Sequence, residues 1–95
     1  MLIKVKKLVW DSWNIAHIAR HDVTPDEVEQ VCHTEPLVQE GKRKRLLVVG
    51  PTDNGRMLAV ILDKEEEKDA YYPITAYKAS KKLIKIYLNQ KEVTK

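Results

Sequence analysis

The chain has 95 residues, of which 43% are hydrophobic and 33% charged, and a formal net charge of +3. A chain of this length forms one domain and buries only about 60–65% of the surface that its unfolded form exposes. Its one cysteine excludes an intramolecular disulfide, its first ten residues lack the apolar run of a signal peptide, and no stretch approaches the roughly 20 apolar residues of a membrane helix. We therefore expect a cytoplasmic single domain over residues 1–95 that has no membrane contact and frays over 91–95.

The chain begins with a predicted edge strand and a short helix. Lysines alternate with apolar residues over 3–9, a pattern typical of a half-polar strand at a sheet edge. Asp11 is a helix N-cap, and the helix that follows runs for about nine residues and ends before His21. We expect its apolar residues to face the core: Trp13, Ile15, Ala16, Ile18 and Ala19.

A second helix is predicted from Pro25 to about His33. Thr24 and Glu27 have the spacing of a capping box, and Pro25 suits the first helical position because its fixed φ matches a helix. The inward residues are expected to be Val28, Val31 and Cys32.

The middle of the chain predicts an antiparallel meander. Residues 37–39 begin a strand that turns at Gly41, and the Val-rich run 46–50 is a central strand. The Asn54-Gly55 turn accepts a positive φ and leads into a strand over 56–63, and a charged loop then leads into a fourth strand over 70–76. Consecutive short turns favour antiparallel neighbours.

The last predicted element is an amphipathic helix over 79–90. Its apolar residues (Leu83, Ile84, Ile86, Tyr87, Leu88) alternate at helical spacing with its lysines (Lys78, Lys81, Lys82, Lys85). One side is therefore expected to pack and the other to carry positive charge.

Charge is segregated along the chain. Residues 24–40 carry five acids and no Lys or Arg, 41–62 carry five bases and one acid, 63–69 carry five acids and two bases, and 70–95 carry six lysines and one acid. This pattern predicts separate acidic and basic surfaces, which fit a basic partner protein and a phosphate-bearing ligand respectively. A solvated surface without a partner is the plainer alternative.

Several short motifs follow one another along the chain. They are Trp10-Asp11, Asn14, His17, Arg20-His21-Asp22-Val23, Glu27-Val28, Val31, Gly55-Arg56-Met57-Leu58, Ile74-Thr75-Ala76, Lys78-Ala79-Ser80-Lys81-Lys82 and Tyr87. In these motifs the chain resembles the BrnT family of bacterial toxins, small RelE-like ribonucleases encoded beside a DNA-binding antitoxin. The resemblance extends from about residue 9 to residue 87.

The resemblance implies an α+β, RelE-like fold with two N-terminal helices and a C-terminal helix packed on a four- to five-stranded, mostly antiparallel sheet. It also implies a metal-independent endoribonuclease toxin of a type II toxin–antitoxin system. RNA would be its substrate, a cognate antitoxin would cover its site, and DNA would be bound only through the antitoxin complex. A homodimer is one open assembly state.

The chain departs from the family pattern at two positions. Tyr77 stands where the family usually has an arginine, and Leu83 stands where an acid is common. These departures favour an alternative, a non-catalytic RNA- or protein-binding module that retains the fold. A DNA-binding repressor is a weaker alternative, because the helix after Val23 is acidic rather than basic.

Cutting RNA without a metal requires a base, a cation that stabilises the phosphorane, and an acid. His21 or Lys78 is the candidate base, and Tyr77 is the candidate acid or a stacking group for a base. Arg56 is the candidate phosphate clamp, because it stands at the rigid start of a strand and its planar fork matches phosphate oxygens. Its structural alternative is an ion pair with Asp53 or a neighbouring acid.

Further cations are predicted to bind the RNA backbone: Arg43, Arg45, Lys81, Lys82 and Lys85. Either arginine of the 42–45 run would complete the clamp with Arg56, since alternation along a strand places Arg43 and Arg45 on the same side. The alternative for this run is a solvated loop. The same alternation places Tyr71 and Tyr77 on one face and Tyr72 on the other, and one of the three is expected in the core.

His17 and His21 stand four residues apart, a spacing at which two imidazoles can share a metal. A zinc-protease helix would need glutamate where Ile18 stands, and Cys32-His33 has no second cysteine beside it. We therefore expect no metal and no cofactor, with His17 packed or in solvent.

Overall fold

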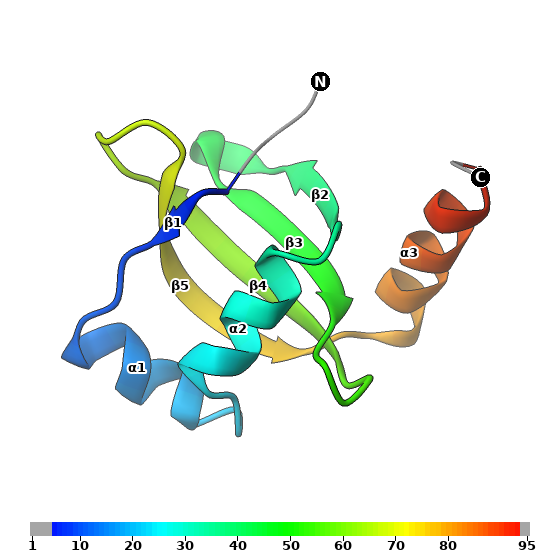
Figure 1. Cartoon of the computed structure of the whole chain (residues 1–95), viewed down its shortest axis with the longest axis horizontal. Helices are drawn as coiled ribbons and strands as arrows, with labels where there is room; N and C mark the ends of the chain where they lie inside the picture. Colours follow the sequence, from blue (N-terminus) through cyan, green and yellow to red (C-terminus); the bar gives the residue numbers. More distant parts are fainter. Residues whose placement is uncertain (1–4, 94–95) are drawn as a thin grey trace.

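The computed structural model describes residues 5–93, with side chains up to residue 90, and its fold class is α+β (Figure 1). The elements in chain order are β1 (Lys7–Leu8), α1 (Ser12–Ala19), α2 (Pro25–Cys32), β2 (Leu37–Glu40), β3 (Leu46–Pro51), β4 (Met57–Lys64), β5 (Ala70–Lys78) and α3 (Lys81–Val93). The part of the predicted first strand before residue 5, and residues 94–95 of the predicted frayed end, lie outside the described residues. No helix within the described range is long and apolar enough to cross a bilayer.

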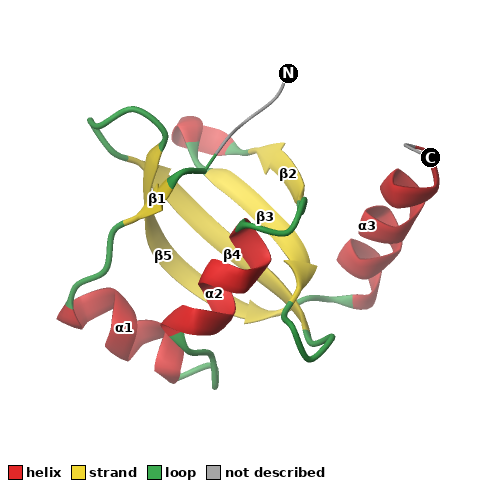
Figure 2. Ribbon diagram, in the orientation of Figure 1, coloured by secondary structure: helices red, strands yellow, loops and turns green. Residues whose placement is uncertain are grey.

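The strands form one mixed sheet in the order β1-β5-β4-β3-β2 (Figure 2). The pairs β2–β3, β3–β4 and β4–β5 are antiparallel, which confirms the predicted meander. The short β1 pairs with β5 in parallel and forms one edge of the sheet, as its lysines indicated. α1 and α2 connect β1 to the antiparallel strands β2–β5, and both helices lie on one face of the sheet (Figure 1).

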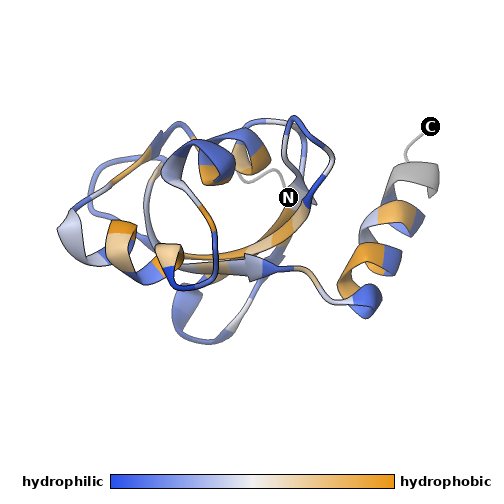
Figure 3. Cartoon of the chain, turned by 90° about the horizontal axis from the view of Figure 1, so that it is seen from below, coloured by the Kyte–Doolittle hydropathy of each residue, from blue (hydrophilic) through white to orange (hydrophobic). Residues whose placement is uncertain are grey.

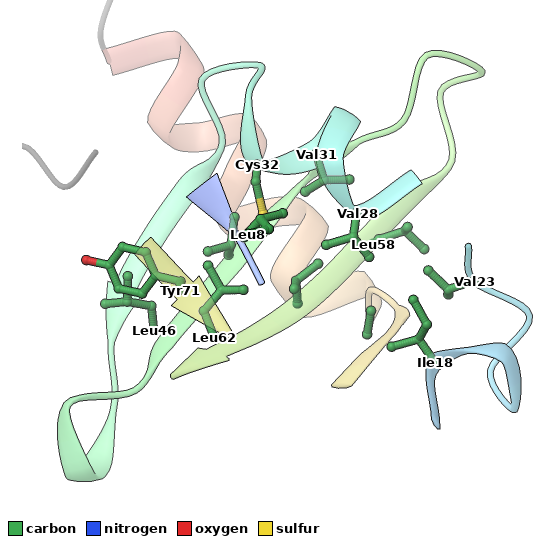
Figure 4. Close-up of a cluster of buried hydrophobic side chains, with 13 residues drawn as sticks. Leu8, Ile18, Val23, Val28, Val31, Cys32, Leu46, Leu58, Leu62 and Tyr71 are labelled. Carbon is green, nitrogen blue, oxygen red and sulfur yellow. The ribbon is translucent and has the colours of Figure 1, made fainter. Parts of the chain in front are cut away.

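The main core lies between the sheet and this helical face. Both helices have complete capping boxes, in which Asp11 is paired with Asn14 and Thr24 with Glu27. The inward residues predicted for α2 are confirmed, and they pack with side chains of β1, α1 and the sheet (Figure 4). The cluster includes Leu8, Ile18, Val23, Val28, Val31, Cys32, Leu46, Leu58, Leu62 and Tyr71.

The prediction that the apolar residues of α1 face the core is wrong for most of them, because they are exposed. Ile18 is fully buried, but Trp13 is 57% and Ile15 is 41% exposed. α1 is only eight residues long and contacts the sheet chiefly at β5, so one narrow stripe of the helix is covered. The second fully buried residue of that stripe is the polar Asn14, whose amide donates to the carbonyls of Val9 (3.0 Å) and Pro73 (3.1 Å).

α3 projects away from the sheet (Figure 3), and its buried side chain packs with residues on the sheet face opposite α1 and α2. Ser80 caps the helix, since its Oγ accepts from the backbone N–H of Leu83 at 3.2 Å. Tyr87 is buried in a second, smaller cluster with Leu37, Val49, Ala59 and Ala79, whereas Leu88 is 53% exposed and does not pack as predicted. The helix is described through Val93.

A β-bulge in β5 corrects the predicted placement of the tyrosines. Ile61 pairs with Thr75 but Leu62 pairs with Pro73, so Ile74 is an extra residue that reverses the alternation of side chains. Tyr71 therefore belongs to the main cluster and Tyr77 to the smaller cluster on the other face. The prediction that one tyrosine is in the core is confirmed by Tyr71.

The predicted alternation of Arg43 and Arg45 does not apply. Residues Lys42–Lys44 form a 3-10 turn rather than a strand, and Arg43 and Lys44 have φ values of 60° and 62°. This turn closes the β2–β3 hairpin, so side chains of the 42–45 run do not alternate as they would along a strand.

Candidate functional site

The predicted site residues fall at two opposite ends of the sheet. The start of β4, the end of β5, the α1–α2 turn and the start of α3 all lie at one end (Figure 1). This end holds His21, Arg56, Tyr77 and Lys78, which we call the His21 corner. The 3-10 turn lies at the other end, because Leu46 pairs with Leu62 at the far end of β4.

His21 and Tyr77 are in contact at this corner. Their ring centroids lie 6.3 Å apart, and the rings meet edge to face at 64°. His21 is exposed just after α1, and its backbone N–H donates to the carbonyl of Ile18 at 3.0 Å. Tyr77 is half-buried in β5 opposite Ala59. An imidazole that can accept a proton therefore lies beside a phenol that can donate one.

Arg56 ties this corner together. Its Nη1 donates to the carbonyl of Asp22 at 2.6 Å and to Oε2 and Oε1 of Glu27 at 3.1 and 3.3 Å. Asp22 adopts a φ of 60°, which is tolerated by aspartate in tight turns. The ion pair predicted as the structural alternative for Arg56 does form, with Glu27 rather than with Asp53.

The surroundings of Glu27 favour the ionised form of its carboxyl. Partial burial acts to raise the pKa of its carboxyl, but hydrogen bonds from the Thr24 backbone N–H and from Arg56 outweigh that effect. The pKa of Glu27 is therefore held below its ordinary value. The same carboxylate serves the α2 capping box and the arginine, so the position of the guanidinium depends on the start of α2.

Exposed lysines stand at the end of β5 and over the first turns of α3. Lys78 is exposed and follows Tyr77 in the strand, so the two side chains leave opposite faces. Lys81 and Lys82 are exposed in the first turn of α3, with Lys85 one turn further. Cations at a helix N-terminus are disfavoured by its partial positive charge, and a bound phosphate would offset that cost.

Arg43 and Arg45 are not part of this corner. They line a hollow of about 390 Å³ at the other end of the sheet, together with Lys42 and the apolar side chains of Leu47 and Ile61. β4 separates the two ends over the five residue steps from Met57 to Leu62, or about 17 Å at the usual strand rise. These arginines and Arg56 therefore cannot hold one phosphate, although both ends can contact one RNA strand.

The described residues offer no evident metal site. No group of three His, Cys, Asp or Glu side chains gathers within the described part of the chain. The thiol of Cys32 is buried, and burial, together with the nearby Glu29 carboxylate, raises its pKa to about 12. Cys32 is therefore a packed side chain of the core rather than a nucleophile.

Sequence reasoning missed a row of rings that leads into the corner. Trp13 and His17 stack with centroids 4.9 Å apart and planes at 7°, and His17 meets His21 at 5.9 Å. The signal was present in the spacing of residues 13, 17 and 21, which share one helical face. We expected Trp13 in the core and His17 packed or in solvent, and considered the spacing of His17 and His21 only as a metal pair, which we rejected.

The chain matches no protein-family model, no curated protein and no solved structure. The motif order and the geometry of the His21 corner are therefore the grounds on which its function is inferred.

Proposed function

We propose that this protein is a metal-independent endoribonuclease of RelE-like fold that acts in the cytoplasm as the toxin of a type II toxin–antitoxin system. The observation that carries the proposal is the contact of His21 with Tyr77, together with the hydrogen bond of the Arg56 guanidinium to the carbonyl of Asp22, the residue next to His21. These three groups are a base, an acid and a cation, which is the set that RNA cleavage without a metal requires.

In the proposed reaction, His21 takes the proton of a ribose 2′-hydroxyl. The 2′-oxygen then attacks the adjacent phosphorus, the new P–O2′ bond forms, and the P–O5′ bond breaks. Tyr77 gives its proton to the departing 5′-oxygen, with Lys78 as the alternative base or acid on the other side of the strand. The products are a 2′,3′-cyclic phosphate and a 5′-hydroxyl, and a proton returned from His21 through water restores Tyr77.

Arg56 is proposed to stabilise the negative charge of the phosphorane. All its side-chain hydrogen bonds within residues 5–90 use Nη1, so Nη2 and Nε are left as donors for phosphate oxygens. The side chain is 32% exposed, which leaves the guanidinium open to a ligand on one side. Its bonds to Asp22 and Glu27 fix its position before substrate arrives, which favours catalysis because no reorganisation is then needed.

The proposed partners follow from the charge of the two ends and from the motif resemblance. RNA would contact the lysines at the start of α3 and, further along the strand, Arg43 and Arg45. An antitoxin would neutralise the protein by covering the His21 corner, and DNA would be bound only by the complex of the two proteins. A homodimer is one assembly compatible with this proposal.

The test is cleavage of a labelled RNA in excess EDTA by wild type, His21→Ala and Tyr77→Phe, with His33→Ala as the matched histidine control. His33 is exposed at the end of α2 and bonds only to Glu29 in the described part of the chain. The two corner variants are expected to lose about 10²- to 10⁴-fold in rate, whereas the control retains its rate. Equal rates for His21→Ala and His33→Ala would contradict the assignment of the base.

A matched pair of variants separates the two roles of Arg56. Both Arg56→Met and Glu27→Gln break the ion pair, but only the first removes the cation. If Arg56 stabilises the phosphorane, Arg56→Met loses about 10²- to 10³-fold in rate, whereas Glu27→Gln loses far less, because the guanidinium remains and still donates to the Asp22 carbonyl. Equal losses in both would assign Arg56 a structural role alone.

The second candidate function is a non-catalytic module that binds RNA or protein through the same basic end. The engagement of Arg56 with Glu27 favours it, because an arginine that fastens a helix needs no substrate. Salt-sensitive RNA binding without any cleavage by wild type would support this alternative and exclude the ribonuclease.

A further inference from the structure

The row of rings on α1 has an open end. Trp13 stacks face to face on His17, and this contact covers one face of the indole. Trp13 is nevertheless 57% exposed, so its other face is open to solvent. An exposed indole face is costly in water and is the surface on which an aromatic ligand stacks best.

The row of rings leads from the first turn of α1 to the His21 corner. From Trp13 it passes through His17 and His21 to Tyr77, with successive centroid distances of 4.9, 5.9 and 6.3 Å. Because successive ring centroids are 4.9 and 5.9 Å apart, the path along the row from Trp13 to His21 is about 11 Å. That length corresponds to about three nucleotides at a spacing of about 3.4 Å per nucleotide.

The charges beside the row suit a nucleic-acid strand. Arg20 is exposed three residues after His17 and on the same side of the helix, and Lys78 is exposed next to Tyr77. At the other end, the carboxylate of Asp11 is fixed by the hydroxyl of Tyr72 and the backbone N–H of Asn14. Cations therefore flank the inner part of the row, and the outer ring lies near an anion, which favours an uncharged base over Trp13 and phosphates nearer the corner.

We propose that α1 is a stacking platform for unpaired bases of an RNA strand, with one base on the open face of Trp13 and the strand continuing along His17 toward the His21 corner. This inference rests on the proposed ribonuclease function, since it names how that site would hold its substrate. It makes the preferred substrate single-stranded, because paired bases have no free face to offer. It also places a binding subsite about three nucleotides from the cleaved bond.

The test measures binding of a single-stranded RNA of eight nucleotides with a 2′-O-methyl group on every ribose. The proposed reaction cannot cleave this strand, because it has no 2′-hydroxyl to attack the phosphorus. In a Trp10→Phe background, Trp13 is the one remaining tryptophan, so its fluorescence reports contact with a base directly. We expect the oligonucleotide to quench this fluorescence, Trp13→Ala to weaken binding about tenfold, and Trp13→Phe to restore most of it. Ile15→Ala is the matched control, because Ile15 is exposed on the same helix but outside the row.

Two results would overturn the platform. One is equal affinity of wild type and Trp13→Ala for the oligonucleotide when both have the same circular dichroism. The other is equal affinity of wild type for the oligonucleotide and for a matched abasic strand, which would show that phosphates alone are bound.

The outcome separates this inference from the ribonuclease proposal. If wild type cleaves RNA to cyclic phosphate ends and Trp13→Ala binds and cleaves equally well, the platform is wrong and the ribonuclease stands. If Trp13 binds the strand but no RNA is cleaved under any condition, the platform stands and the ribonuclease is wrong. Quenching of Trp13 by a protein partner but not by the oligonucleotide would contradict the platform.

Discussion

Replacing Arg56 with methionine is expected to destabilise the fold by a definite amount. The change keeps an apolar stem but removes the guanidinium, which bonds to the Asp22 carbonyl and to both oxygens of Glu27. A buried hydrogen bond to a charged group is worth roughly 1.5–3 kcal/mol. The two side chains are 32% and 23% exposed, so solvent screening reduces this figure, and we expect a loss of about 1–2 kcal/mol.

The assay is urea unfolding followed by tryptophan fluorescence at neutral pH. In a thermal scan, the same loss of free energy would lower the melting temperature of a domain this small by about 5–15 °C. A double-mutant cycle with Glu27→Gln isolates the pair itself, for which we expect a coupling energy of about 0.5–1 kcal/mol. A change below about 0.3 kcal/mol in the single variant, with no coupling in the cycle, would refute the view that Arg56 fastens the α1–α2 turn to β4.

Further expected outcomes concern the core, the thiol, acid stability and one turn. Asn14→Ala leaves the Val9 and Pro73 carbonyls without their donor and breaks the α1 capping box, so urea unfolding should show a loss of about 2–3 kcal/mol; a neutral result would mean that water replaces the amide. Cys32 should react with a thiol reagent at pH 8 only as fast as the protein unfolds, and rapid labelling of the native state would contradict its burial and its raised pKa of about 12. The pKa of Glu27 is lower in the folded state than in the unfolded state, so its stabilisation is present above its ordinary pKa and is lost as pH falls through the folded value; Glu27→Gln should flatten the acid limb of stability against pH, and an unchanged limb would exclude this carboxyl as a cause. Gly55 has a φ of 83°, so Gly55→Ala should cost about 1 kcal/mol in the same unfolding assay although its side chain would meet open space.

Local sequence signals were sufficient for most of the architecture. The Asp11 N-cap, the Thr24–Glu27 capping box, the Asn54-Gly55 turn and the Val-rich central strand act through bonds and torsions within a few residues. Such signals can be interpreted without knowledge of the rest of the chain, and the helix starts and the antiparallel order followed from them. The parallel pairing of β1 with β5 depends on residues more than sixty positions apart and could not be predicted from local pattern.

The errors have two physical causes. Periodicity gives the face that a residue shares, but not which face the rest of the protein covers, so the exposure of Trp13 and Leu88 was missed. One extra residue reverses every later side chain of a strand, so the bulge at Ile74 moved Tyr77 to the face opposite Tyr71.

The candidate site was predictable as a set of residue types but not as an arrangement. His21, Arg56 and Tyr77 were all identified from sequence, and the fold brings them to one corner. The distance between Arg56 and the 42–45 run was not predictable, because it depends on which ends of β3 and β4 carry the two segments. The ion pair of Arg56 with Glu27 likewise depends on how α2 is placed over the sheet.

The most direct test of the proposed function is the chemistry of the RNA ends that wild type produces in excess EDTA. The proposed mechanism predicts cleavage that leaves a 2′,3′-cyclic phosphate and a 5′-hydroxyl, and it predicts that a substrate with 2′-O-methyl groups throughout stays intact. Cleavage that requires a divalent metal, cleavage that leaves a 5′-phosphate, or the absence of cleavage at protein concentrations that saturate RNA binding would contradict it.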